Sequence, residues 1–319
     1  MPSLDNAADE RPGIDPILTK VLDAVPFRLS TDDGILAARQ RLRDLPRRAL
    51  HPELRVEDRA IDGPGAPIGI RIYWPPTSSD LKPPVVVFFH GGGFVMGDLD
   101  THDGSCRQHA VGAGAVVVSV DYRLAPEYPY PAAVEDAWAA TVWVADHGAD
   151  IGADTTRLAL AGDSAGGTIA AVIAQLARDR GGPRVAFQLL WYPCTLWDIS
   201  LPSYTENATA PILDVAAIAE FSRCYAGKVD LSDPPAGMAP GRAKNLAGLP
   251  PAYIGVAGYD PLRDDGIRYG ELLSAAGVQV QVHNAATLVH GYIGYAGVVP
   301  AATAAMGRGL AALWAALRR

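Results

Sequence analysis

The stretch Gly162-Asp163-Ser164-Ala165-Gly166-Gly167 decides how this chain of 319 residues folds. An apolar run over residues 157–161 precedes it, and an alanine-rich helical pattern over residues 168–177 follows it. A Gly-x-Ser-x-Gly motif between a strand and a helix holds its serine on a sharp turn, with the hydroxyl above the sheet. A glycine-rich turn that merely contains a serine would look the same, so the interpretation depends on partner residues elsewhere in the chain.

The composition predicts a globular protein with enough apolar material for a core. Hydrophobic residues make up 49% of the chain and charged residues 19%. The net charge is -8 and no basic stripe is present, so we expect no nucleic-acid partner. The three cysteines are scattered and form no Cys-x-x-Cys motif, which argues against a structural metal site.

Neither targeting nor membrane insertion is expected from the sequence. The N-terminus lacks the basic and then apolar pattern of a signal peptide. No apolar run reaches the ~18 residues that suggest a membrane span. The sequence therefore predicts a protein without a membrane span, located in the cytoplasm.

Strand-like and helix-like segments alternate along most of the chain. Strands are expected at residues 55–61, 67–74, 84–89, 114–120, 158–161, 185–191, 252–256 and 278–283. Helices are expected at residues 15–25, 35–45, 134–147, 165–177, 215–225, 262–275 and 301–317. This order predicts an α/β fold with a mostly parallel sheet of about eight strands, flanked by helices and with an antiparallel hairpin at one edge. An exposed edge strand near Val278 would support a homodimer.

Two regions do not follow the alternation. Residues 1–50 contain helical pieces with little strand character, and residues 192–248 form a proline-rich insertion with one helical stretch. An insertion of this size exceeds what a simple connection needs. We expect residues 51–319 to form the main domain and the two regions to form a helical cap, although residues 1–50 would equally suit a simple packing arm.

A nucleophilic serine needs a general base, and the base needs an orienting acid. In sheets of this kind functional groups gather at the carboxyl ends of the strands. Asp260 and His290 each follow an expected strand, and the order Ser164, Asp260, His290 is the one typical of this serine turn.

Three other residues compete for these roles. Asp264 and Asp265 lie in the first turns of the following helix, where acidic residues commonly interact favourably with the helix dipole. His283 is expected to end a strand, where a structural histidine is more common. His290 precedes Gly291, which leaves its ring accessible on a tight loop, so we favour His290 as the base.

The glycine-rich loop His90-Gly91-Gly92-Gly93 follows the expected strand at residues 84–89. Consecutive glycines let backbone amides approach a ligand closely. The N–H groups of Gly91, Gly92 and Ala165 are the predicted donors to an oxyanion. A phosphate site is disfavoured, because Met96 occupies the last glycine position of a Gly-x-Gly-x-x-Gly pattern.

The acidic cluster after this loop resembles a metal site only superficially. It consists of Asp98, Asp100, His102 and Asp103. A calcium loop starting at Asp98 would need glycine at its sixth position and glutamate at its twelfth, where Asp103 and His109 stand. We therefore expect helix capping and loop hydrogen bonds here, and no metal.

Five motifs together resemble a known family. They are His90-Gly91-Gly92-Gly93-Phe94, Asp121-Tyr122-Arg123-Leu124-Ala125-Pro126-Glu127, Gly162-Asp163-Ser164-Ala165-Gly166-Gly167, Asp260-Pro261-Leu262-Arg263-Asp264 and His290-Gly291. From about Val56 onward the chain is similar to the hormone-sensitive-lipase-like esterases, the bacterial family IV carboxylesterases of the α/β-hydrolase fold. The resemblance implies nucleophile Ser164, acid Asp260 and base His290, with the oxyanion donors predicted above. It also implies a cap built from the two regions that interrupt the alternation.

The predicted activity is that of a serine carboxylesterase that hydrolyses short- to medium-chain acyl esters without a cofactor. The same triad would serve an amidase or lactonase, and receptors for small molecules share the fold but alter the base histidine. Four residues are candidates for the substrate pocket, although each would equally suit an ordinary core: Phe94, Tyr122, Trp197 and Phe221.

Overall fold

A computed structural model describes residues 11–76 and 82–318, and within these ranges the sheet has eight strands. The strands are β1 (Val56–Ile61), β2 (Ile68–Tyr73), β3 (Pro84–Phe89), β4 (Val116–Asp121), β5 (Asp154–Asp163), β6 (Val185–Trp191), β7 (Ala252–Tyr259) and β8 (Val280–Val289). Their spatial order is β1-β2-β4-β3-β5-β6-β7-β8. Only β2 pairs antiparallel, with β1 and β4. The predicted mostly parallel sheet with an antiparallel edge is confirmed.

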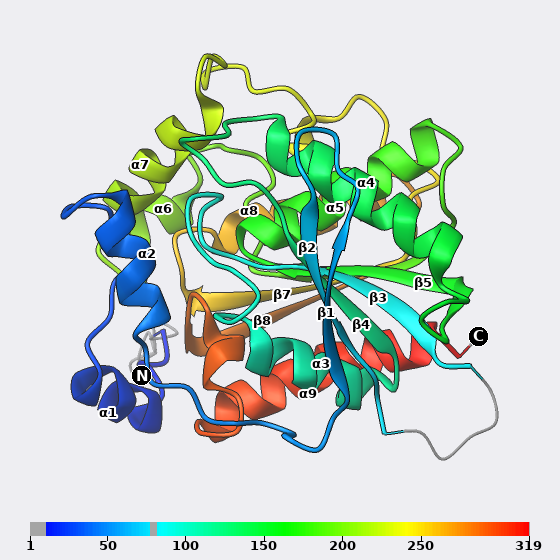
Figure 1. The fold of residues 1–319 in the computed structure, drawn as a ribbon. Coiled ribbons are helices and arrows are strands. Elements are labelled where there is room, and N and C mark those ends of the chain that lie inside the picture. Colours follow the sequence, from blue (N-terminus) through cyan, green and yellow to red (C-terminus); the bar gives the residue numbers. More distant parts are fainter. Residues whose placement is uncertain (1–10, 77–81, 319) are drawn as a thin grey trace, which may run out of the picture.

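Helices cover both faces of the sheet (Figure 1). One face carries α4 (Ala132–His147), α5 (Ala165–Asp179) and α8 (Arg263–Ala275), and the other carries α3 (Asp103–Ala113) and α9 (Pro300–Ala316). All six residues of β3 are buried, and alternate side chains join the apolar clusters on opposite faces. Because successive side chains of a strand point to opposite faces, an unbroken apolar run suits a strand covered on both sides.

Three strands run further than the sequence predicted, and this brings the candidate residues to the strand ends. β5 continues through Asp163, which pairs with Trp191 of β6. β7 and β8 continue together until Tyr259 lies opposite Val289. His283 therefore lies within the edge strand β8 and does not end it. The extensions include glycine, alanine and polar residues, and pairing with the neighbouring strand outweighs the lower strand propensity of these residues.

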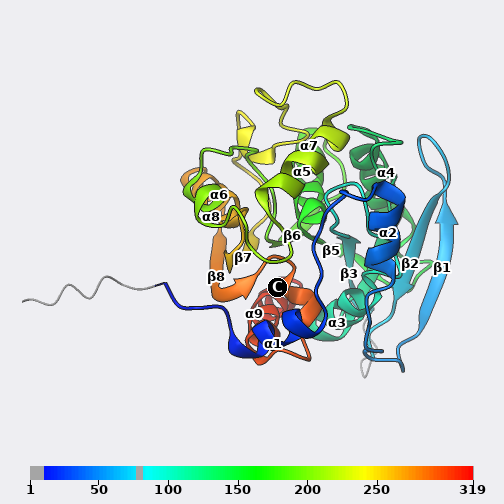
Figure 2. The same cartoon turned by 90° about the vertical axis from the view of Figure 1, so that its left-hand side faces the viewer.

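Four helices lie on the side of the sheet where β7 ends (Figures 1 and 2). They are α1 (Pro16–Ala24), α2 (Ile35–Arg43), α6 (Pro202–Glu206) and α7 (Val215–Ala226). The N-terminal segment is joined to the insertion, because the Leu29 N–H donates to Ile212 O at 2.7 Å and Arg28 forms an ion pair with Asp214. The sequence did not predict α6, which has only five residues.

Asp264 and Asp265 anchor the insertion, so the interpretation as residues that only favour the helix dipole is wrong. Asp265 is fully buried and accepts hydrogen bonds from the Thr195 N–H at 2.7 Å and the Leu196 N–H at 2.6 Å. Asp264 accepts from the Ser203 N–H at 2.8 Å. Burial raises the pKa of Asp265 to about 6, against the effect of these hydrogen bonds.

No helix among residues 11–76 and 82–318 is both long and apolar enough to cross a lipid bilayer. β8 forms the edge of the sheet, as the sequence suggested for the region near Val278. A homodimer through this edge stays a prediction.

His109 lies in α3 and is fully buried. The Ser105 carbonyl lies 2.7 Å from Nδ1, and the Trp191 indole donates to Nε2 at 3.0 Å. Because a carbonyl only accepts and an indole N–H only donates, Nδ1 carries the proton and the ring is neutral. Burial lowers the pKa of His109 to about 4.

We expect this histidine to make stability depend on pH. His109 binds a proton near pH 6.5 in the unfolded chain but only near pH 4 in the folded chain. Between these pH values the unfolded state therefore holds more protons than the folded state. The free energy of unfolding should therefore fall by roughly 3 kcal/mol per such histidine as the pH decreases through this range. His90, whose pKa burial also lowers to about 4, adds to the same slope.

Urea unfolding at several pH values tests this expectation. His109→Gln should flatten the dependence between pH 4 and pH 6.5 relative to wild type. The matched control is His147→Gln, because His147 is exposed at the end of α4 and should leave the slope unchanged. If the free energy of unfolding changes equally with pH in wild type and in His109→Gln, the lowered pKa of the buried His109 is contradicted.

Candidate active site

Ser164 lies on a strained turn between β5 and α5. Its backbone has φ 54° and ψ -120°, a conformation that is costly for a residue with a side chain. The Ser164 N–H donates to Trp191 O at 2.8 Å. A Cβ atom on Gly166 would lie 1.9 Å from Phe89 O, so only glycine allows β3 and α5 to approach this closely. The turn has the geometry that the sequence motif predicted.

Ser164, His290 and Asp260 form a continuous hydrogen-bonded chain. His290 Nε2 lies 3.0 Å from Ser164 Oγ, and His290 Nδ1 lies 2.7 Å from Asp260 Oδ2. The Leu262 N–H donates to Asp260 Oδ1 at 2.8 Å. Because the buried carboxylate accepts hydrogen bonds, it holds the proton on Nδ1 and leaves the Nε2 lone pair facing the serine hydroxyl.

Two residues that the sequence did not indicate support this chain. Asn207 Nδ2 in the insertion donates to Asp260 O at 3.0 Å and to Gly258 O at 3.3 Å, which fixes the loop after β7. Tyr192 packs its ring against the His290 imidazole, with 4.7 Å between centroids. Tyr192 directly follows β6, so the rule that functional groups gather at the carboxyl ends of strands would have indicated it. No sequence signal marks Asn207.

The glycine-rich loop departs from the prediction at Gly91. The Gly91 N–H donates to Asp163 Oδ1 at 2.9 Å, so this amide is already engaged and the expectation for it needs correction. Gly92 has φ 118°, and its carbonyl accepts from the N–H groups of Val95 and Met96, each at 3.0 Å. Gly92 and Gly93 both line the cavities beside Ser164. A Cβ atom on Gly92 would lie 2.1 Å from Met96 O, so the loop requires glycine there.

Asp163 holds this loop against the serine turn. Asp163 is buried, and its carboxyl also lies 3.5 Å from His102 Nε2. Burial alone would raise the pKa of Asp163, but His102 and the Gly91 N–H lower it below its ordinary value. The residue lies inside the serine motif, yet the motif itself gives no indication of this role.

The acidic cluster after the loop forms the loop hydrogen bonds that the sequence predicted, but the predicted helix cap is wrong, because α3 begins after His102 without a hydrogen bond from a capping side chain. The Thr101 N–H donates to Asp98 Oδ1, and the Asp98 N–H donates to Thr101 Oγ1, both at 2.8 Å. Asp100 pairs with Arg71, and Asp103 pairs with Arg107. Within residues 11–76 and 82–318 no group of three His, Cys, Asp or Glu side chains is arranged to hold a metal ion.

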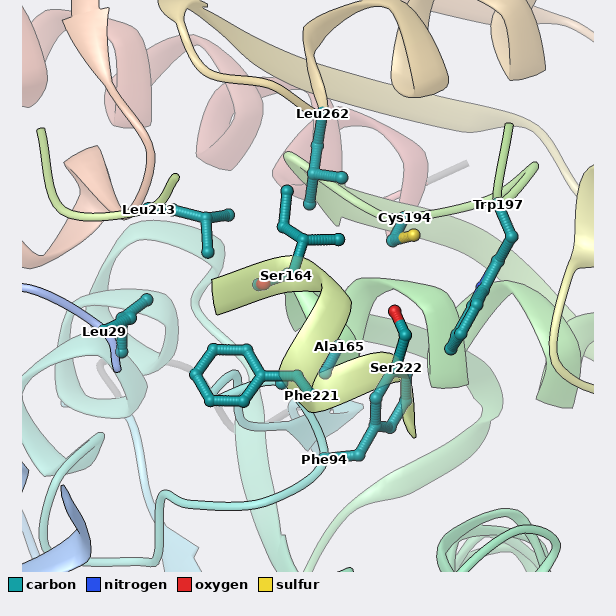
Figure 3. Close-up of a pocket in the computed structure, with 12 residues that line it drawn as sticks. Leu29, Phe94, Ser164, Ala165, Cys194, Trp197, Leu213, Phe221, Ser222 and Leu262 are labelled. Atoms are coloured by element: carbon teal, nitrogen blue, oxygen red, sulfur yellow. The ribbon is translucent and has the colours of Figure 1, made fainter. Parts of the chain in front are cut away.

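Two cavities meet at Ser164. The small cavity has a volume of about 40 Å³, and residues lining it include Phe94, Trp197, Leu213, Ile218, Phe221 and Leu262 (Figure 3). The large cavity has a volume of about 380 Å³, and residues lining it include Val21, Phe27, Leu45, Gln108, Tyr192 and His290.

Three of the four pocket candidates line the small cavity: Phe94, Trp197 and Phe221. Tyr122 lines neither cavity. Its ring stacks on His90 with 4.3 Å between centroids, and its hydroxyl donates to His90 O at 2.6 Å. Tyr122 therefore supports the base of the glycine-rich loop from the core side.

Comparison with known proteins agrees with this architecture. Residues 86–294 match the family described as having the alpha/beta hydrolase fold, which establishes the class of protein. The chain is 79% identical over 314 residues to "Esterase LipI" of Mycobacterium tuberculosis, covering 98% of each chain. It is 57% identical over 312 residues to "Carboxylesterase NlhH" of the same species, covering 96% of this chain and 97% of that one.

Solved structures agree with the sequence relatives. The fold matches the crystal structure of DphMB1 with a TM-score of 0.93 and 65% identity, over 96% of this chain and 100% of that chain. It matches a hyperthermophilic esterase from Pyrobaculum calidifontis with a TM-score of 0.85 and 38% identity, over 95% and 99% of the two chains. The chain therefore belongs to the hormone-sensitive-lipase-like carboxylesterases of the α/β-hydrolase fold, and it is a carboxylic ester hydrolase.

Proposed function

We propose that this protein hydrolyses carboxylic esters through an acyl-enzyme formed on Ser164. His290 Nε2 removes the hydroxyl proton as Ser164 Oγ attacks the ester carbonyl carbon. The resulting imidazolium is stabilised by Asp260. His290 then returns the proton to the alcohol oxygen as the C–O bond breaks, and the acyl group stays on Ser164. Water, activated by the same imidazole, releases the acid and restores the serine.

The observation that carries this proposal is the hydrogen-bonded chain from Ser164 Oγ through His290 to Asp260. The contacts of 3.0 Å and 2.7 Å are within the range that proton transfer needs. The chain runs through buried groups, where electrostatic stabilisation of an imidazolium by a carboxylate is stronger than in water.

We assign the oxyanion donors to the backbone N–H groups of Gly92, Gly93 and Ala165. Gly93 and Ala165 line the small cavity beside Ser164, and Gly92 lines the large one. Gly91 is replaced in this set, because its N–H donates to Asp163. Asp163 then acts as a positioning residue, since it fixes the loop whose next two amides face the substrate.

The N-terminal helices and the insertion serve as the cap of this site. Leu29 from the first region and Leu213, Ile218 and Phe221 from the second all line the small cavity. Since both regions close over the serine, they set which acyl groups fit. Short- to medium-chain esters are the substrate class this arrangement supports.

Matched substrates test the proposal against the amidase and lactonase alternatives. Purified enzyme is assayed with p-nitrophenyl butyrate, with the p-nitroanilide of butyric acid, and with γ-butyrolactone. We expect the ester to be hydrolysed with the highest kcat/KM. Faster turnover of the anilide or the lactone would overturn the assignment to esters, because all three substrates present the same number of acyl carbons.

A further inference from the structure

We propose that Arg39 of α2 is a positioning residue for ester hydrolysis. It holds the oxyanion turn, residues 92–96, which carries two of the amides assigned to the oxyanion. The N-terminal region then takes part in the chemistry and does not only enclose the substrate. This inference rests on the proposed function, because it uses the oxyanion donors assigned there.

Arg39 lies on the face of α2 that packs against the main domain. Ile35, Ala38 and Leu42 on this face join the apolar cluster on one side of the sheet, and positions three or four apart share one side of a helix. The Arg39 side chain is only 17% exposed. Because a charged side chain is rarely buried to this extent without partners, its contacts indicate what the residue does.

The Arg39 guanidinium binds two backbone carbonyls and one carboxylate. Nε donates to Val95 O at 2.8 Å, and Nη2 donates to Ala125 O at 3.0 Å. Nη1 and Nη2 donate to the two carboxylate oxygens of Glu127 at 2.8 Å and 2.7 Å. Because a guanidinium is planar and presents its N–H groups in a fixed geometry, these bonds fix its orientation as well as its position. Arg39 therefore connects α2 to two separate loops of the main domain.

The oxyanion turn needs such support because its backbone is strained. Phe94 has φ 63°, a value that is uncommon for a residue with a side chain. The N–H groups of Val95 and Met96 both donate to Gly92 O at 3.0 Å, which closes the turn, and the Ala125 N–H donates to Phe94 O at 2.9 Å. Strained backbone persists only where its surroundings hold it in place.

The carbonyl of Val95 is the point where Arg39 acts on this turn. Val95 is fully buried, and among residues 11–76 and 82–318 no other hydrogen bond reaches its carbonyl oxygen. A buried carbonyl without a donor costs free energy, so loss of Arg39 should make the turn rotate. Rotation would redirect the N–H groups of Gly92 and Gly93, which belong to the same short turn. Displacement by about 1 Å in an active site can lower the rate about 100-fold.

The insertion also contacts the oxyanion turn. The Phe94 ring stacks on Tyr225 of α7, with 3.7 Å between ring centroids and 5° between the ring planes. A Cβ atom on Gly93 would lie 2.5 Å from the Phe221 ring, so α7 packs directly against the turn. Both parts of the cap therefore contact the oxyanion turn, and this links the position of the cap to the geometry of the oxyanion site.

Steady-state kinetics of Arg39→Ala test the inference. Both tetrahedral intermediates of ester hydrolysis carry an oxyanion and the bound ester does not, so misplaced amides weaken the transition state more than substrate binding. We expect kcat for p-nitrophenyl butyrate to fall ~10- to 100-fold, while KM changes less than ~3-fold. A residue that only enclosed the substrate would raise KM and leave kcat unchanged.

Arg41→Ala is the matched control. Arg41 lies on the same helix, forms an ion pair with Asp33 and donates to Ser30 O at 2.7 Å, and these partners belong to the N-terminal region. Both variants remove one arginine and its ion pair from α2, and thermal unfolding reports the stability that each loses. Only Arg39→Ala should lose kcat.

Two conservative variants separate the carbonyl contact from the ion pair. Glu127→Gln weakens the ion pair but leaves both carbonyl contacts of Arg39 in place, so kcat should stay within ~3-fold of wild type. Arg39→Lys keeps the charge but not the planar fork, so its kcat should lie between those of wild type and Arg39→Ala. Arg39→Lys carries the test if the alanine variant does not fold.

A trifluoromethyl ketone measures the oxyanion site without turnover. Butyl trifluoromethyl ketone forms a hemiketal as Ser164 Oγ bonds to its carbonyl carbon, the hydroxyl proton passes to His290, and the ketone oxygen becomes the oxyanion. Its inhibition constant should rise in Arg39→Ala by the same factor by which kcat/KM falls. In Arg41→Ala the inhibition constant should equal that of wild type.

The outcomes separate this inference from the proposed function. Wild-type kcat in folded Arg39→Ala, or an equal fall of kcat in Arg41→Ala, would overturn the inference while Ser164 keeps its role. Unchanged affinity for the ketone beside a lowered kcat would overturn it as well. Failure of the folded wild type to hydrolyse p-nitrophenyl butyrate would instead contradict the proposed function.

Discussion

Replacement of Ser164 by alanine should lower ester turnover by at least ~10³-fold, the scale seen when a member of such a triad is removed. The substitution removes the Oγ atom that lies 3.0 Å from His290 Nε2 and leaves no nucleophile at the meeting point of the two cavities. Alanine keeps the Cβ atom that serine already accommodates at φ 54°, so the backbone strain is unchanged. The variant should therefore fold like wild type.

Initial rates with p-nitrophenyl butyrate measure this effect, and circular dichroism and thermal unfolding report the fold. Ser200→Ala is the matched control, because Ser200 is exposed and lines neither cavity. It should keep wild-type activity. Retention of more than a tenth of the wild-type rate by well-folded Ser164→Ala would remove the serine from the mechanism.

Substitution of Asp260 by asparagine should lower kcat by roughly 10⁴-fold, the scale known for this change in serine triads. The Leu262 N–H donates to Asp260 Oδ1, so the asparagine oxygen would keep that position and its NH₂ group would face His290 Nδ1. An N–H donor there forces Nδ1 to be the acceptor and moves the ring proton to Nε2. The imidazole would then be unable to accept the Ser164 proton.

Steady-state kinetics with Asp260→Asn measure this prediction. Its control is Asp233→Asn, because Asp233 lies on the surface with its side chain 95% exposed. Turnover by the control should equal that of wild type. A folded Asp260→Asn enzyme with kcat near that of wild type would show that the tautomer of His290 is set by another group.

The sequence predicted the bounds of a strand correctly where the hydrophobic pattern covers the whole segment that pairs in the sheet. The apolar run of β3 predicted a strand buried on both faces, and that strand was found with the predicted bounds. β8 was predicted to end at His283, but it continues to Val289 alongside β7. Such extension depends on the partner strand, which is distant in the sequence and leaves no local pattern.

The candidate site was likewise predicted from the sequence only in part. The Gly-x-Ser-x-Gly motif selected Ser164, and the rule that functional groups follow strand ends selected Asp260 and His290. In the structure each of the three directly follows the end of its strand. The expectation drawn from the consecutive glycines failed at Gly91, whose N–H donates to the Asp163 carboxylate. The roles of Leu29 and Asn207 arise from tertiary contacts between the N-terminal region, the insertion and the sheet. No spacing or composition signal encodes such contacts.

Labelling with diethyl p-nitrophenyl phosphate tests most directly whether Ser164 is the nucleophile of an acyl-enzyme. This ester transfers a diethylphosphoryl group to an activated serine and leaves a stable adduct, which peptide mass spectrometry locates. We predict one group per chain, carried by the peptide that contains Ser164, with ester turnover lost in proportion to labelling. Full ester turnover by enzyme labelled at Ser164, or inactivation with the label on another residue, would contradict the mechanism.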